Sequence, residues 1–213
     1  MARCRNLRQL SLLPLLYGLD IETDTAVDGL DPSVARIVAV ALSTPDGDEV
    51  IGGPERSILR RLDHELRKAP PGVIVTWNGS GFDLPFLADR AARHRLRLGL
   101  RLHADQGIGQ PHPPLRGHGA PYRARWHRHL HLDACTLYRG LLAPGQACGL
   151  KAVARSHGLE PVELDASSIH MARRGSLVDY VASDARLARL LAEMAWLSAG
   201  RVLDPVDLVD LVS

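Results

Sequence analysis

The sequence predicts an α/β fold in which a central mixed β-sheet is flanked by helices. Short apolar segments rich in Val and Ile come first, and segments with a helical period then alternate with further strands. No internal repeat interrupts this order. Hydrophobic residues make up 46% of the 213 residues, which is sufficient for one domain with a complete core. We therefore expect a single domain over residues 1–213.

Apolar patterns and turn residues mark the elements of the first half. Strands are expected in four segments: 12–23, 34–43, 49–51 and 73–76. The turn residues 44–48 predict a hairpin between the second and third of these strands. Helices are expected over 54–69, with Pro54 at the start, and over 83–94. The first helix carries one apolar stripe, made of Ile58, Leu59, Leu62 and Leu66.

The second half is less regular. Residues 104–126 carry Gly, Pro, His and Arg without periodicity, which indicates a loop or insertion. A strand is expected over 130–133, and a helix over 150–157 with Gly158 as its C-cap. The longest helix is expected over 176–197, with Ser176 as its N-cap.

Charge, cysteine content and the N-terminal segment bear on the partners and the location of the protein. The formal net charge is only +2, so a nucleic-acid partner must be judged from local charge. The three cysteines form no CxxC pair, which favours reduced thiols and a cytoplasmic location. The basic and then apolar start resembles a short signal peptide. It lacks a small-residue cleavage site, however, and nothing is long enough to span a membrane, so we expect no membrane partner.

The acidic pair Asp20 and Glu22 ends the first predicted strand. Side chains alternate along a strand, so both carboxylates project from one face and Ile21 from the other. Two such carboxylates repel each other unless a divalent cation lies between them. The pair therefore predicts half of a metal site. Asp24 has the same parity, but the strand is ending there, and we interpret it as solvated.

Two further segments carry candidate site residues. Trp77 to Leu87 leaves a buried strand through a glycine-containing turn and brings Asp83 to the end of the sheet. In the last helix, Tyr180 and Asp184 are four residues apart and share a face, which Asp179 does not. Asp133 also ends a strand, and we consider it for a supporting role beside the metal ligands.

Together these motifs resemble the 3′-5′ exonucleases of the DEDD group, which have a ribonuclease H-like fold. Asp20 and Glu22 resemble the first exonuclease motif, and Asn78 to Asp83 the second. Tyr180 and Asp184 resemble the third motif in its tyrosine form. No motif is specific alone, but all three occur in the expected order and structural context.

The resemblance also indicates the subclass. The histidine form places a histidine five residues before the last aspartate, where this chain has Asp179, so the tyrosine subclass (DEDDy) is expected. Residues 17–196 are similar to the exonuclease domain of family B DNA polymerases. We expect no polymerase domain in this chain, and residues 103–131 do not map onto the family pattern.

The resemblance implies a site with two divalent cations, and the hard oxygen ligands favour Mg²⁺ or Mn²⁺. Asp20 would bridge both ions, Glu22 and Asp184 would complete the site of the ion that holds the attacking water, and Asp83 would hold the second ion. Tyr180 would orient the water, because a phenol with a pKa near ~10 is a poor base at neutral pH.

The resemblance further implies contacts with the terminal nucleotide. They are assigned to Asn78 and Phe82, with Ile21 and Thr23 as additional candidates.

The segment before Asp133 leaves two interpretations open. His127, His129 and His131 alternate, so a strand would place them on one face and allow a zinc site. The arginines among them favour instead a basic, partly exposed segment. Candidate nucleic-acid contacts are Arg123, Arg125, Trp126 and Arg128, together with Arg93, Arg95, Arg97 and Arg101. Solvated arginines and a buried tryptophan are the alternatives.

The predicted function is a metal-dependent 3′-5′ exonuclease that acts on single-stranded nucleic acid and releases nucleoside monophosphates. DNA is favoured over RNA, and a separate polymerase or repair protein is a candidate partner. Two alternatives remain: a nucleic-acid-binding module that retains the fold without turnover, and an exonuclease that trims RNA or oligoribonucleotide 3′ ends.

Overall fold

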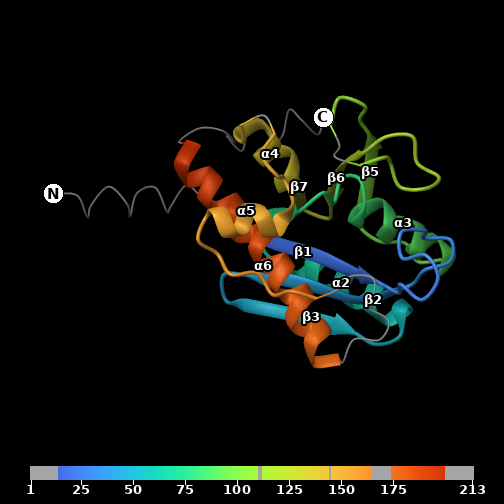
Figure 1. Cartoon of the computed structure of the whole chain (residues 1–213). Coiled ribbons are helices and arrows are strands. Elements are labelled where there is room, and N and C mark those ends of the chain that lie inside the picture. Colours follow the sequence, from blue (N-terminus) through green and yellow to red (C-terminus); the bar gives the residue numbers. More distant parts are fainter. Residues whose placement is uncertain (1–13, 110–111, 144, 165–173, 200–213) are drawn as a thin grey trace.

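The computed structural model describes residues 14–109, 112–143, 145–164 and 174–199. Seven strands form one sheet in the order β3-β2-β1-β4-β7-β6-β5 (Figure 1). Their bounds are β1 Leu16–Thr23, β2 Ile37–Thr44, β3 Gly47–Gly52, β4 Val73–Thr76, β5 Leu100–Ala104, β6 Tyr122–Trp126 and β7 His129–Asp133. Strands β1, β4 and β7 are parallel, whereas the other pairings are antiparallel, so the predicted mixed sheet is confirmed.

Helices cover both faces of the sheet. Helices α2 (Glu55–Lys68) and α3 (Asp83–Arg93) bury the larger apolar core against one face, with the predicted α2 stripe fully buried. Helix α6 (Arg174–Ala199) crosses the opposite face, and α4 (Ala134–Leu141) and α5 (Leu150–Ser156) pack beside it. In Figure 1, α6 lies in front of β1, β2 and β3, and α2 lies behind them.

Helix α6 approaches β1 very closely at Gly18. A Cβ atom added to Gly18 would lie 2.0 Å from the carbonyl oxygen of Ala185, so any larger residue would push the helix away from the strand. This contact aligns the middle of α6 with the centre of β1. It thereby fixes the distance between Asp184 and Asp20.

Most predicted elements are confirmed, and the differences have physical causes. The segment expected to be a loop, 104–126, contains strand β6, in which Ala124 and Trp126 are buried. Strand β5 and helix α4 were not predicted. Ser176 is not an N-cap, because Arg174 and Gly175 before it are already helical. The first two residues of the predicted first strand lie outside the described residues.

Within the described segments, no helix is long and apolar enough to cross a membrane. Cys135 and Cys148 are free thiols, and their sulfur atoms lie 3.9 Å apart. Cys4 lies outside the described residues.

Candidate active site

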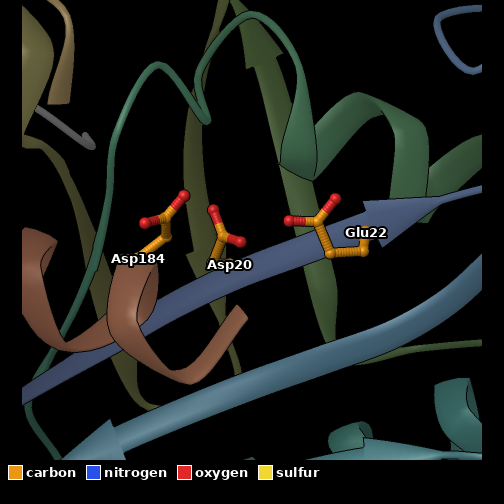
Figure 2. Close-up of side chains that lie close together, drawn as sticks. All are labelled: Asp20, Glu22 and Asp184. Carbon is orange, nitrogen blue, oxygen red and sulfur yellow. The ribbon is translucent and has the colours of Figure 1, made fainter. Parts of the chain in front are cut away.

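Three carboxylates from two elements meet on the α6 face of the sheet. Asp20 and Glu22 project from β1, and Asp184 projects toward them from α6 (Figure 2). One carboxylate oxygen from each lies within 4.8 Å of the others. Among the described residues, this is the one group of three His, Cys, Asp or Glu side chains with that spacing. Such an arrangement of oxygen ligands suits a hard divalent cation.

Asp83 lies beside this group, and its charge contributes to the raised pKa values of Asp20 and Glu22. It is the first residue of α3, where the helix N-terminus stabilises an anion, and it is buried. Its Oδ1 accepts a hydrogen bond from the backbone N–H of Ile21 at 3.3 Å. Because Ile21 lies between the two acidic residues of β1, this bond holds Asp83 beside the strand segment that carries them.

Asp133 holds the turn that leads to Asp83. Its Oδ1 accepts hydrogen bonds from the N–H of Asn78 at 2.9 Å and of Cys135 at 3.1 Å, and its Oδ2 accepts from the N–H of Ser80 at 2.9 Å. Asn78 has a φ of 65°, a conformation that non-glycine residues rarely adopt. Asp133 therefore compensates a strained turn.

Burial and mutual repulsion raise the pKa values of the clustered carboxyl groups. Burial is the main cause for Glu22, whose pKa rises to about 8, for Asp83, whose pKa rises to about 7, and for Asp184, whose pKa rises to about 6. For Asp20, burial and then the charges of its three acidic neighbours raise the pKa well above its usual range. The negative charge of the ionised group thus exceeds the positive charge near it, and bound cations would offset the difference.

Lys151 on α5 is a cation at this site that no sequence motif indicated. Its Nζ lies 3.7 Å from Oδ2 of Asp184 and 3.8 Å from the centre of the Tyr180 ring, and it donates to the carbonyl oxygen of Val162 at 2.8 Å. The charge of Lys151 opposes the rise in the pKa of Asp184. Its one sequence signal was its place at the start of a predicted helix, which is not specific.

Tyr180 lies beside Asp184, as their spacing predicted. The phenol is buried and hydrogen-bonded to the Asp184 carboxylate. Burial first, and then the charges of Asp184, Glu22 and Asp20, raise the pKa of Tyr180 further above its usual value. The phenol therefore stays protonated and is a donor. Oδ1 of Asp184, in contrast, is buried with no hydrogen-bond partner in the described part of the chain, as a metal ligand would be. Asp179 is exposed, as expected.

The predicted substrate residues lie in different surroundings. Asn78 and Phe82 line a pocket of about 540 Å³ next to the turn that carries Asp83. Ile21 is buried in the core, so its side chain cannot reach a substrate. Thr23 is also buried, and its hydroxyl donates to the carbonyl oxygen of Gly29 at 2.7 Å, which anchors a loop that forms one wall of the same pocket.

The three alternating histidines do not form a metal site. His127 lies in the turn between β6 and β7 and pairs with Asp63, and His129 bonds to the carbonyl oxygen of Leu66. His131 bonds to the hydroxyl of Thr76 at 2.8 Å. Burial lowers the pKa of His131 to about 4 and also lowers that of His129, so both stay neutral. The favoured interpretation of a basic, partly exposed segment is therefore wrong for His129, which is buried and neutral, and for the charge of His131, which is partly exposed but neutral.

The arginines of this segment are at the surface, but its tryptophan is not. Trp126 is buried and donates to Oδ1 of Asp63 at 2.9 Å, so its ring cannot stack on a base. Arg125 and Arg128 are exposed. Arg123 is paired with Asp105.

Comparisons with known proteins agree with this geometry. Residues 33–166 match a family model described as "Predicted 3'-5' exonuclease related to the exonuclease domain of PolB". The catalytic subunit of DNA polymerase epsilon from Schizosaccharomyces pombe is 37% identical over 113 residues, which are 52% of this chain and 5% of that protein. The corresponding subunit from Dictyostelium discoideum is 34% identical over 113 residues, or 52% of this chain and 4% of that protein.

A solved structure shows the same likeness. The family B DNA polymerase of Pyrobaculum calidifontis superposes with a TM-score of 0.65 and 25% identity, over 85% of this chain and 24% of the polymerase chain. The chain thus spans only a small part of the relatives that it matches.

Proposed function

Because the chain belongs to the family of 3′-5′ exonucleases related to the exonuclease domain of family B DNA polymerases, we propose that it removes nucleotides from the 3′ ends of single-stranded DNA with the help of two divalent cations. The observation that carries this proposal is the convergence of Asp20, Glu22 and Asp184, with Asp83 hydrogen-bonded to the same strand. Within the described part of the chain, Lys151 is the one basic side chain that forms an ion pair with Asp184.

The four carboxylates fit Mg²⁺ or Mn²⁺. All are hard oxygen donors, and Oδ1 of Asp184, which has no hydrogen-bond partner among the described residues, is available as a ligand atom. Asp20, Glu22 and Asp184 would hold one ion, and Asp20 and Asp83 the other. When bound, such ions would lower the pKa of a water molecule and neutralise charge on the phosphate.

Two other side chains would act on the reacting groups. Tyr180, which stays protonated, would position the attacking water by a hydrogen bond. Lys151 would offset negative charge at Asp184 and keep the phenol ring in place through the contact over its face. Asn78 and Phe82 would contact the terminal nucleotide at the pocket that they line.

We expect Tyr180→Phe to lower kcat by ~10–10³-fold while KM changes little, because it removes one positioning contact and no metal ligand. Single-turnover rates with a labelled oligonucleotide would measure this. The matched control is Tyr138→Phe, since Tyr138 donates instead to the carbonyl oxygen of Leu191 within the core. Equal rates for Tyr180→Phe and the unchanged protein would show that the phenol takes no part in the reaction.

We also expect metal binding to depend on pH. The raised pKa values mean that Glu22, Asp83 and Asp184 bind more protons in the folded protein than in the unfolded chain between about pH 4 and pH 8. Without metal, the contribution of these three groups to stability therefore falls as pH rises through this range. Metal needs the ionised carboxylates, so its binding strengthens over the same range.

Thermal unfolding with and without excess Mn²⁺ would measure this dependence. The rise in Tm caused by Mn²⁺ should be larger at about pH 8 than at about pH 5.5. The Asp20→Asn variant should lose most of the rise. A rise that is equal at both pH values, or that survives in Asp20→Asn, would place the metal elsewhere.

The function itself is tested on a 5′-labelled single strand of DNA with Mg²⁺ or Mn²⁺. A ladder that shortens from the 3′ end, with nucleoside monophosphates as products, is the expected result. If the folded protein cleaves nothing with either ion, the proposal is contradicted. The remaining alternative is then a nucleic-acid-binding module without turnover. The same assay on an RNA strand of the same sequence distinguishes a DNA exonuclease from one that trims RNA 3′ ends. Faster cleavage of RNA than of DNA would favour the trimming activity.

A further inference from the structure

A basic groove lies on the surface formed by α2 and the segment that joins α3 to β5. It consists of two adjoining hollows of about 340 and 270 Å³, which share Leu96, Arg97 and Leu98. Five basic side chains line the groove: Arg60, His64, Arg67, Arg97 and Arg101. All five are exposed. None of them belongs to the site described above.

The charge of the groove is positive because its one acidic lining residue, Asp63, is already engaged. Oδ1 of Asp63 accepts from the N–H of Gly99 at 2.7 Å and from the ring N–H of Trp126, and Oδ2 pairs with Arg67 at 3.1 Å. Arg60 and Arg97, in contrast, have no ion-pair partner among the described residues. Two guanidinium groups thus face solvent across one hollow with no counter-charge of their own.

The chemistry of the groove fits a chain of phosphates. A guanidinium group binds a phosphate through two parallel N–H bonds, and successive arginines along a groove match a repeating phosphate backbone. Leu96 and Leu98 are partly buried between the arginines and offer an apolar surface to sugars. Residues 93–101 contain four arginines and no acidic residue, so no neighbouring charge of this segment opposes an anion.

The groove lies at the end of the sheet away from the carboxylates. Asp63 bonds to Trp126 and pairs with His127, which places the groove at the turn before β7. The other end of β7 is Asp133, which holds the turn of Asp83. Five residues of strand span ~17 Å. A nucleic acid that reaches both places therefore has to span at least this distance, which is about five nucleotides at the ~3.4 Å rise of a stacked strand.

We propose that the basic groove binds the sugar–phosphate backbone of a nucleic-acid strand at a distance from the cleaved end. This inference rests on the proposed function only for the identity of that strand, which is the one whose 3′ end is removed. The groove then increases affinity for long substrates and leaves short ones unaffected.

The test compares two double variants with the unchanged protein. Arg60→Gln with Arg97→Gln removes two charges of the groove that have no ion-pair partner among the described residues. Arg61→Gln with Arg186→Gln is the matched control, because these exposed arginines pair with Glu49 and Asp48 of β3, outside the groove. Binding of a fluorescein-labelled single strand of about 25 nucleotides is followed by anisotropy without divalent ions, at several salt concentrations.

The groove variant should bind the long strand about 10-fold more weakly, with a slope of log K against log salt that is smaller by ~1.4, or ~0.7 for each lost phosphate contact. Cleavage of a tetranucleotide should be unchanged. The proposal would be overturned if the groove variant bound the strand with the affinity and salt slope of the unchanged protein. It would also be overturned if the control variant lost as much affinity as the groove variant. Displacement of the strand by polyglutamate at equal charge concentration would overturn it too, because it would indicate a site for acidic proteins. Binding is measured without cleavage, so an inactive protein would refute the exonuclease proposal and leave this one standing.

Discussion

Asp20→Asn should abolish cleavage and at the same time stabilise the protein in the absence of metal. Activity should fall by at least ~10²–10³-fold, the order of one strong electrostatic contribution in an active site. Stability should increase because the substitution removes a charge that burial and three acidic neighbours disfavour. A gain on the order of 1 kcal/mol corresponds to a rise in Tm of about 2–4 °C for a chain of this size.

The opposite signs of the two effects make this prediction specific. Asp184→Asn should lose activity to a similar extent. Asp179→Asn is the matched control, because Asp179 is an exposed aspartate of the same helix outside the cluster, and it should alter neither quantity. Initial rates of cleavage with Mn²⁺ measure the loss of activity. Thermal unfolding without metal measures the gain in stability. Substantial activity in Asp20→Asn would exclude Asp20 from the metal site.

Asp133→Ala should cause the largest loss of stability among single changes near the site. The carboxylate accepts three backbone N–H groups, and its removal leaves these buried donors without an acceptor. We expect a loss of about 2–4 kcal/mol in the free energy of unfolding. Activity should also decline, because the turn of Asn78 would no longer hold Asp83 in place.

A conservative change provides the control for this prediction. Asp133→Asn retains Oδ1, which serves Asn78 and Cys135, and gives up the acceptor of Ser80 alone. Its loss of stability should be clearly smaller than that of Asp133→Ala. Urea unfolding at neutral pH would rank the two variants. Equal stability of Asp133→Ala and the unchanged protein would show that the turn holds its conformation without this carboxylate.

Strong periodicity explains which elements were predictable from the sequence. The alternation in β1 placed Asp20 and Glu22 on one face, and the stripe of α2 identified buried positions. Strand β5 is a half-exposed edge strand in which Arg101 and His103 alternate with Leu100 and Leu102. Its polar residues conceal the pattern on which strand prediction depends.

Contacts between distant segments explain what could not be predicted at the site. Lys151 reaches Asp184 only because α5 packs on α6, a neighbour relation that no local pattern specifies. Asp133 was a candidate for a supporting role, but two of its three N–H partners, Asn78 and Ser80, depend on the pairing of β4 with β7. The basic groove likewise combines α2 with a segment some thirty residues later along the chain.

The most direct test of the two-cation site is an anomalous scattering map of a crystal soaked in Mn²⁺. Two peaks about 4 Å apart, one among Asp20, Glu22 and Asp184 and the other between Asp20 and Asp83, are the expected result. A map without peaks at these carboxylates, or with its main peak at the histidines before Asp133, would contradict it.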